Sequence, residues 1–139
     1  MDNEKRNIEH SSTFIYKGDI MGKPRQTRSD RWRKRPCVLR YRSIKDEMVR
    51  QAKEQNFELS DNVAIKIYLV MPDSWSKKKK ETMLYQPHKV KPDIDNTVKL
   101  IFDVLRDNDS DIYCMKVAKY WSYENKIEIR NEVNYVDIF

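Results

Sequence analysis

Two carboxylates stand one residue apart in the stretch K-P-D-I-D-N-T-V-K-L-I-F-D-V-L, residues 91–105. They belong to Asp93 and Asp95, at the start of a segment with helical spacing. Two neighbouring acids repel each other, so the pair is easier to accommodate with a cation beside it. Mg²⁺ and Mn²⁺ bind one or two protein carboxylates together with waters and phosphate oxygens. The spacing therefore predicts a site for Mg²⁺, with Mn²⁺ as the alternative ion. As the plainer alternative, Asp95 acts only as the N-cap of the helix.

A third acid could complete such a site. Asp109 lies in the turn R-D-N-D-S-D-I, which follows the same helical segment and precedes a strand. It would join Asp93 and Asp95 if that strand runs back beside the start of the helix. The alternative is that residues 106–111 form only a solvated acidic turn.

A lysine shares the helical segment with these acids. Lys99 is one helical turn after Asp95 and one turn before Asp103, so all three side chains can share a face. Two exposed ion pairs at this spacing would stabilise the helix by only ~0.2–0.5 kcal/mol each. Alternatively, Lys99 lies beside the metal and stabilises negative charge that develops on a phosphate. Spacing alone leaves both interpretations open.

The chain is basic, with 28 Lys and Arg against 22 Asp and Glu and a formal net charge of +6. An excess of this sign favours a polyanionic partner, and nucleic acid is the leading candidate. The basic residues concentrate in two segments. The alternative to DNA binding is that these segments are only solvated by water. The candidate DNA-binding residues are Lys23, Arg25, Arg28, Arg31, Arg33, Lys34, Arg35, Lys77, Lys78, Lys79 and Lys80.

The elements that would position these residues follow from periodicity and turn signals. Apolar residues every three to four positions predict helices, and alternation predicts strands. Two consecutive strands joined by Glu124 and Asn125 suggest a hairpin. The predicted elements are a strand over 12–18, a loop over 19–40, a helix over 41–57, a strand over 62–71, a loop over 73–91, a helix over 95–106, and strands over 113–123 and 126–133.

This order, βαβαββ, predicts an α/β (α+β) fold with a mixed sheet of about four strands and two covering helices. The 139 residues suit a single domain. Residues 1–11 are polar and expected to be loose, and 19–40 and 73–91 are expected to be long basic loops. His88 and Trp75 fall in the second loop, where we expect His88 to be an exposed loop residue.

The remaining features favour the cytoplasm. Cys37 and Cys114 are isolated, so neither a zinc module nor a disulfide framework is indicated. No apolar run has the length of a signal peptide core or a membrane span. We therefore expect a reduced, cytoplasmic setting and no membrane partner.

The segments K-P-D-I-D-N-T-V-K, F-D-V-L and N-D-S-D-I together resemble the signature of the RusA-type Holliday-junction resolvases, many of which phages and prophages carry. The similarity is specific over about residues 60–133, including M-P-D-S-W-S-K-K-K-K, and looser over 12–40, where G-K-P-R-Q-T-R is similar to the basic N-terminal loop of the family. A phage or prophage origin in a bacterial host is the corresponding expectation.

The resemblance implies a dimeric, Mg²⁺-dependent endodeoxyribonuclease that nicks two strands of like polarity across a four-way DNA junction. By position, Asp93, Asp95 and Asp109 correspond to its metal-binding carboxylates and Lys99 to its catalytic lysine. Relatives often have Asp-Asp where this chain has Asn108-Asp109, so one charge is missing. Asn96, Asn108 and Asp103 are expected to support the site from nearby. The alternatives are a metal-dependent nuclease with broader specificity for branched or duplex DNA, or a non-catalytic basic DNA-binding protein.

Overall fold

A four-stranded mixed sheet forms the centre of the protein. The computed structural model describes residues 10–24, 36–106 and 109–132. Strand order is β1-β4-β2-β3, with β2 and β3 parallel and β4 antiparallel to both β1 and β2. The elements are β1 (Thr13–Lys17), α2 (Pro36–Glu54), β2 (Asn62–Val70), α3 (Lys77–Met83), α4 (Ile94–Leu105), the short 3₁₀ helix η2 (Asp109–Asp111), β3 (Cys114–Ser122) and β4 (Lys126–Asn131).

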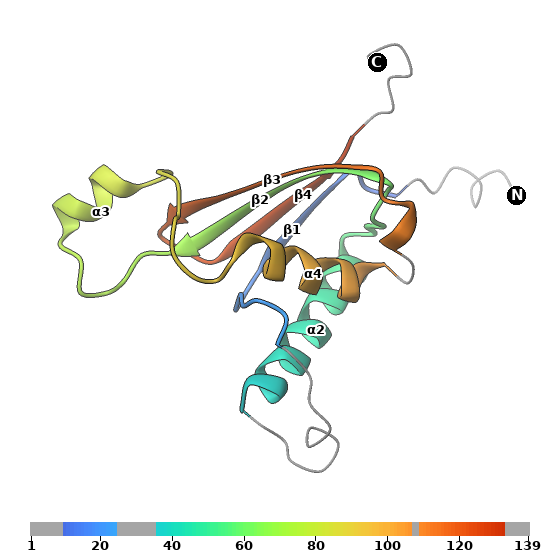
Figure 1. Ribbon diagram of the computed structural model, residues 1–139, viewed down its shortest axis with the longest axis horizontal. Helices are drawn as coiled ribbons and strands as arrows, with labels where there is room; N and C mark the ends of the chain where they lie inside the picture. Colours follow the sequence, from blue (N-terminus) through green and yellow to red (C-terminus); the bar gives the residue numbers. More distant parts are fainter. Residues whose placement is uncertain (1–9, 25–35, 107–108, 133–139) are drawn as a thin grey trace, which may run out of the picture.

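The long helices α2 and α4 cover the same face of the sheet, and α3 lies beyond the end at which β2 and β3 terminate (Figure 1). Because β4 lies between β1 and β2, the two strands that flank α2 run in the same direction without touching. The helix α4 returns the chain from the end of β2 to the start of β3. This return places the start of α4 near the later half of β3.

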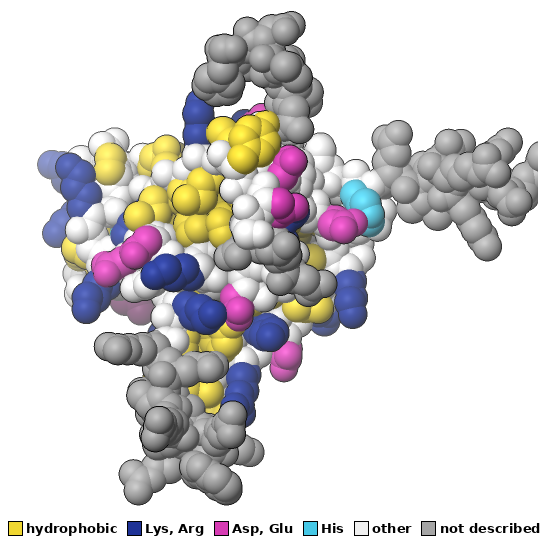
Figure 2. Space-filling view, turned by 45° about the vertical axis from the view of Figure 1, so that its right-hand side comes forward, with side chains coloured by type: hydrophobic (Ala, Val, Ile, Leu, Met, Phe, Trp, Pro, Cys, Tyr) yellow, Lys and Arg dark blue, Asp and Glu magenta, His cyan; other side chains and the backbone are white. Residues whose placement is uncertain are grey.

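Charges of both signs cover the surface. On the face shown in Figure 2, Lys and Arg side chains lie on several parts of the molecule, with Asp and Glu side chains between them. The residues drawn in colour therefore do not form one uniformly basic face in this view. Within the described residues, no helix is both long enough and apolar enough to cross a membrane.

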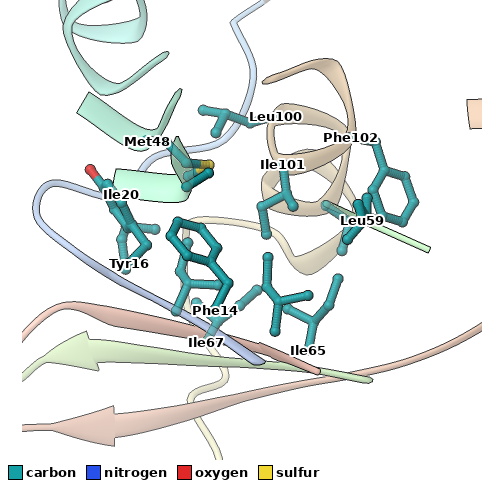
Figure 3. Packing of buried hydrophobic residues seen from close by; sticks show 14 of the residues in the cluster. Phe14, Tyr16, Ile20, Met48, Leu59, Ile65, Ile67, Leu100, Ile101 and Phe102 are labelled. Atoms are coloured by element: carbon teal, nitrogen blue, oxygen red, sulfur yellow. The ribbon is translucent and has the colours of Figure 1, made fainter. Parts of the chain in front are cut away.

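The core lies between the sheet and the two long helices. Ile65 and Ile67 of β2 and Phe14 of β1 point toward Met48 of α2 and Ile101 of α4 (Figure 3). Each of these five side chains is at most 2% exposed. Alternating residues of the strands and one face of each helix supply this layer, as the periodicity of the sequence predicts.

The predicted fold class is confirmed: a single α/β domain contains a four-stranded mixed sheet covered by helices. Two predicted loops are shorter than expected. Residues 73–91 include α3, whose N-cap Ser76 accepts a hydrogen bond from the backbone N–H of Lys79. The predicted loop 19–40 ends early because α2 begins at Pro36, a residue type well suited to a first helical turn. Ser11, expected to be loose, forms a β-bridge with Phe57.

The predicted hairpin between the last two strands is wrong. The strands β3 and β4 lie on opposite sides of β2, so the connection over residues 123–125 passes the end of that strand. The side chain of Asn125 accepts a hydrogen bond from the backbone N–H of Val70, the last residue of β2, at 2.8 Å. Neighbouring strands are ~4.8 Å apart, so a connection of this length can skip one strand. The residue types of the turn therefore could not distinguish pairing of β3 with β4 from pairing of both strands with β2.

Candidate functional site

The start of α4 presents both predicted acids. Asp93 occupies the N-cap position and Asp95 the first turn, so the expectation of an N-cap at Asp95 is wrong by two residues. The backbone carbonyl of Asp93 accepts hydrogen bonds from the backbone N–H and the hydroxyl of Thr97. The side chain of Asp93 makes no capping hydrogen bond. Within the described part of the chain neither carboxylate has an ion pair, so capping and charge pairing do not explain why two acids stand here.

These two carboxylates line a hollow of about 480 Å³, here named the acid hollow. Its wall comes from the segment before α4, from the first turn of α4 and from β3. The lining residues are His88, Lys89, Val90, Lys91, Asp93, Ile94, Asp95 and Lys119. A second hollow, of about 390 Å³, shares Lys91 and Asp93 with the first, so Asp93 lies between two concave surfaces.

The segment before α4 is held along the edge of β3. Backbone N–H groups of Tyr85 and His88 donate to Trp121 and Lys119, and Trp121 donates in turn to Gln86. The side chain of Lys119 then donates to the carbonyls of Val90 and Pro92 at 2.7 and 2.6 Å. These bonds fix the chain immediately before Asp93. Burial lowers the pKa of Lys119, while the negative charge of Asp93 acts in the opposite direction.

The second hollow, here named the loop hollow, lies between the chain after β1 and the start of α4. It is lined by Ile20, Met21, Gly22, Lys23, Arg40, Lys91, Pro92, Asp93 and Asn96. A Cβ atom at position 22 would lie 2.9 Å from the Cβ of Asn96, so the close approach requires glycine there. The backbone N–H of Lys23 donates to the carbonyl of Asn96 at 3.0 Å. Asn96, expected to support the site, therefore joins the loop to the helix.

Asp103 is further along α4 and faces a different group. Its carboxylate accepts hydrogen bonds from the hydroxyl of Tyr41 on α2 and from the ammonium of Lys23, the latter at 3.2 Å. The bond from Tyr41, and then the bond and the charge of Lys23, hold the pKa of Asp103 below its usual value although burial opposes them. Asp103 therefore joins α4 to α2 and to the loop after β1, and its side chain makes no contact with Asp93 or Asp95 among the bonds of the described residues.

The structure does not bring all predicted site residues together. Lys99 is exposed one turn after Asp95 and makes no ion pair with any residue that the structure describes. Asp109 begins η2 and Asp111 of the same turn pairs with Arg106, so residue 109 follows the C-terminal end of α4. At 1.5 Å per residue the 12-residue helix places ~18 Å between its ends. The side chain of Asp109 and residue Asn108 lie outside the described residues.

Some of the predicted DNA-binding residues lie in the described part of the chain and others lie outside it. Arg25, Arg28, Arg31, Arg33, Lys34 and Arg35 lie outside the described residues, whereas Lys23 lines the loop hollow. Lys77, Lys78 and Lys79 are exposed on α3. The ammonium of Lys79 lies 4.2 Å from the ring centroid of Trp75, which itself packs on Trp121 at 4.8 Å. Trp75 is therefore part of the junction between α3 and the sheet.

Sequence reasoning missed two residues of the acid hollow. The expectation that His88 is an exposed loop residue is wrong: it is 6% exposed and packs on Trp121 with ring centroids 4.1 Å apart. Burial, and then the charge of Lys119, lower its pKa and so favour the neutral imidazole. Lys119 was missed too, although it offers a signal: a lysine at an inward position of a strand breaks the alternation.

The donors at the acid hollow suit a hard divalent cation. Mg²⁺ commonly takes one or two protein carboxylates and completes its shell with waters and phosphate oxygens. Asp93 and Asp95 supply that number, and neither is engaged by another described side chain. Within residues 10–24, 36–106 and 110–132 no three His, Cys, Asp or Glu side chains gather closely enough to hold a metal alone. The donor set of Asp93 and Asp95 therefore fits an ion held jointly with a bound phosphate.

Two comparisons with known proteins show what this chain is similar to. The family model described as endodeoxyribonuclease RusA matches residues 18–132, which include the lining of both hollows and the strands β2, β3 and β4, but not β1. The uncharacterized protein YqaN of Bacillus subtilis (strain 168) is 40% identical over 74 residues, which cover 47% of this chain and 51% of that relative. The chain thus spans about half the length of the curated relative that it matches.

Proposed function

Because the chain belongs to the RusA endodeoxyribonuclease family, we propose that it is a metal-dependent endonuclease that resolves four-way DNA junctions by paired, symmetric nicks. The observation that carries this proposal is the pair of unengaged carboxylates at the start of α4, beside a hollow with lysines in its wall. Mg²⁺ is the proposed ion, and Mn²⁺ is the proposed substitute.

In the proposed mechanism, Asp93 and Asp95 hold the ion and thereby fix it at the N-terminal end of α4. Once bound, Mg²⁺ supplies polarisation of the scissile phosphodiester and lowers the pKa of a water for in-line attack. Lys99, exposed on the next turn, offsets negative charge on the phosphate as the transition state forms. Lys23 and the cations of α3 hold the flanking strand through its phosphates.

Asp109 is the proposed third acid. Because residue 109 follows the far end of α4, its participation requires either movement of the turn or a second copy of the chain. Paired nicks across a junction also require two active sites related by a twofold axis, so we propose a homodimer. Sedimentation of the purified protein tests the dimer directly, and a monomer at working concentration would contradict it.

The first experiment compares nicking of a synthetic four-way junction with nicking of a matched linear duplex, each with Mg²⁺ and with EDTA. Paired nicks in the junction alone, dependent on metal, support the proposal. Metal-dependent nicks in both substrates favour the broader nuclease. Tight junction binding with no product in any condition favours a non-catalytic binding protein.

Variants then test the acids. Asp93→Asn, Asp95→Asn and Asp109→Asn should each remove nicking and retain junction binding in EDTA. Asp46→Asn, an exposed carboxylate on α2, is the matched control and should nick at the wild-type rate. If the variants lose binding and nicking in parallel, the acids are structural. Wild-type nicking by Asp109→Asn alone would leave Asp93 and Asp95 as the acids of the site.

A further inference from the structure

Lys119 occupies a position in the sheet where an apolar residue is expected. It is paired in register with Ile67, which is fully buried, and its inward neighbours along β3 are Val117 and Trp121. Lys119 is partly buried there. Moving an ammonium from water toward an apolar environment costs free energy, so lysine at such a position usually has a partner. A lysine at this position therefore calls for an explanation beyond packing.

Two carbonyl groups hold this ammonium in place. Its Nζ donates to Val90 at 2.7 Å and to Pro92 at 2.6 Å, and burial lowers its pKa. An ammonium group has three N–H donors, so one remains. Within the described residues this third donor has no partner, and Lys119 forms no ion pair with Asp93. The side chain belongs to the wall of the acid hollow, together with Asp93 and Asp95.

We propose that Lys119 binds a non-bridging phosphate oxygen of the DNA strand in the acid hollow through its third N–H. This inference rests on the proposed function and adds to it a second, fixed cation. A surface lysine must lose side-chain freedom when it binds a phosphate, whereas the two carbonyls have already restricted the side chain of Lys119. The site therefore presents a positioned donor instead of a mobile one.

Charge balance favours a phosphate as the group bound there. The charges of Asp93 and Asp95 together match one divalent cation, so the lysines of the wall, Lys89, Lys91 and Lys119, leave the hollow with an excess of positive charge. A phosphodiester carries one negative charge and accepts hydrogen bonds at two oxygens, so it can contact the ion and Lys119 at once. The other role consistent with the two carbonyl bonds is a tether that only holds the segment before Asp93 against β3.

The test measures the affinity for a four-way junction in EDTA at several salt concentrations. Each phosphate contact contributes ~0.9 to the slope of log K against log salt. Lys119→Met, which keeps the length and removes the charge, should reduce that slope by ~0.9 and lower Mg²⁺-dependent nicking by roughly 100-fold or more. Lys116→Met, exposed three residues earlier on the same strand, is the matched control and should leave slope and nicking unchanged.

A second variant separates phosphate binding from tethering. Lys119→Gln keeps two N–H donors for the carbonyls and removes the charge, so under our inference it should show the same reduced slope as Lys119→Met. Wild-type slope and nicking in Lys119→Gln, or an unchanged slope in both variants, overturn the inference. A lowered melting temperature of Lys119→Met beside an unchanged slope would then assign the side chain the role of a tether. Because the slopes are measured without metal, they can be read even if the wild-type protein does not nick. Absence of nicking by the wild type would instead overturn the proposed function.

Discussion

At the scale of single residues, the carboxylates of Asp93 and Asp95 form neither a capping hydrogen bond nor an ion pair with the described residues. Asp93 holds the N-cap position, yet only its backbone carbonyl takes part in the helix start, through Thr97. Replacing a side chain that caps typically costs ~1 kcal/mol, but no such bond is present here. Stability and activity should therefore separate at these positions.

We predict that Asp93→Asn changes the free energy of unfolding by less than ~0.5 kcal/mol, as expected for a surface substitution that breaks no bond. Nicking should be lost in the same variant. Urea denaturation followed by circular dichroism, beside the nicking assay, measures both quantities. A loss of stability of several kcal/mol together with activity would instead assign the acid a structural role.

His88 illustrates a second residue-scale effect, because its Nδ1 is buried and has no hydrogen-bond partner among the residues that the structure describes. Burial and Lys119 lower its pKa below 6.5, the value expected in the unfolded chain. The unfolded chain therefore takes up a proton more readily than the folded protein. This contribution to stability is fully present above pH 6.5 and is lost as the pH falls toward the folded pKa.

We predict that the free energy of unfolding of the wild-type protein decreases between pH 7 and pH 5, and that His88→Phe shows a weaker decrease. The phenyl ring retains the packing on Trp121 but has no proton to gain. Urea denaturation at several pH values measures the difference. Equal pH dependence in the two proteins would mean that His88 is accessible to protons in the folded state.

At the scale of elements, α4 is positioned by three different parts of the chain. Its apolar face packs on the sheet, its start is attached to the loop after β1 through Lys23 and Asn96, and its later turns are joined to α2 through Asp103 and Tyr41. The segment before it is held against β3 by Lys119. The carboxylates at its start therefore have a fixed position relative to the sheet.

We predict that Tyr41→Phe and Asp103→Asn each lower the free energy of unfolding by about 1 kcal/mol, and that the double variant loses less than the sum. The Asp103 side chain is 36% exposed, so solvent limits the value of its charged contacts. Its lowered pKa means that the unfolded chain binds a proton first, so this stability is present above about pH 4 and lost in more acidic solution. Additive losses, measured by urea denaturation, would contradict the coupling.

At the scale of the whole molecule, the net charge of +6 and the extension of α3 beyond the sheet favour contact with DNA away from the proposed catalytic acids. The lysines of α3 are exposed at its start, and its connection to the sheet is braced by Trp75 against Trp121. A short helix supported in this way can present its cations at a defined distance from the acid hollow.

We predict that the double variant Lys77→Ala, Lys78→Ala weakens junction binding and reduces the slope of log K against log salt by ~1–2, because up to two phosphate contacts are lost. The control pair Lys45→Ala, Lys53→Ala removes the same charge from exposed positions on α2. Titrations in EDTA at several salt concentrations measure both. Equal slopes in the two double variants would show that α3 contributes only through net charge.

The periodicity of the sequence was enough to predict the core-forming helices and strands, the fold class and the position of two acids at the start of α4. This was possible because burial patterns repeat with the geometry of each element. Strand pairing was not predictable in the same way. The short link at residues 123–125 can join adjacent strands or skip one, and only the packing of β2 between β3 and β4 decided the outcome.

The local sequence also determined that Asp93 and Asp95 lie together, since one residue separates them. Only the tertiary structure brought Lys119 and His88 to the hollow that Asp93 and Asp95 line. Lys119 follows Asp95 by 24 residues, and His88 lies in the segment before α4. Residue 109 begins η2 after the C-terminal end of α4, and its part in the site stays a prediction. Contacts of this kind depend on how the segment before α4 lies along β3, and on hydrogen bonds between positions distant in sequence, which residue spacing does not record.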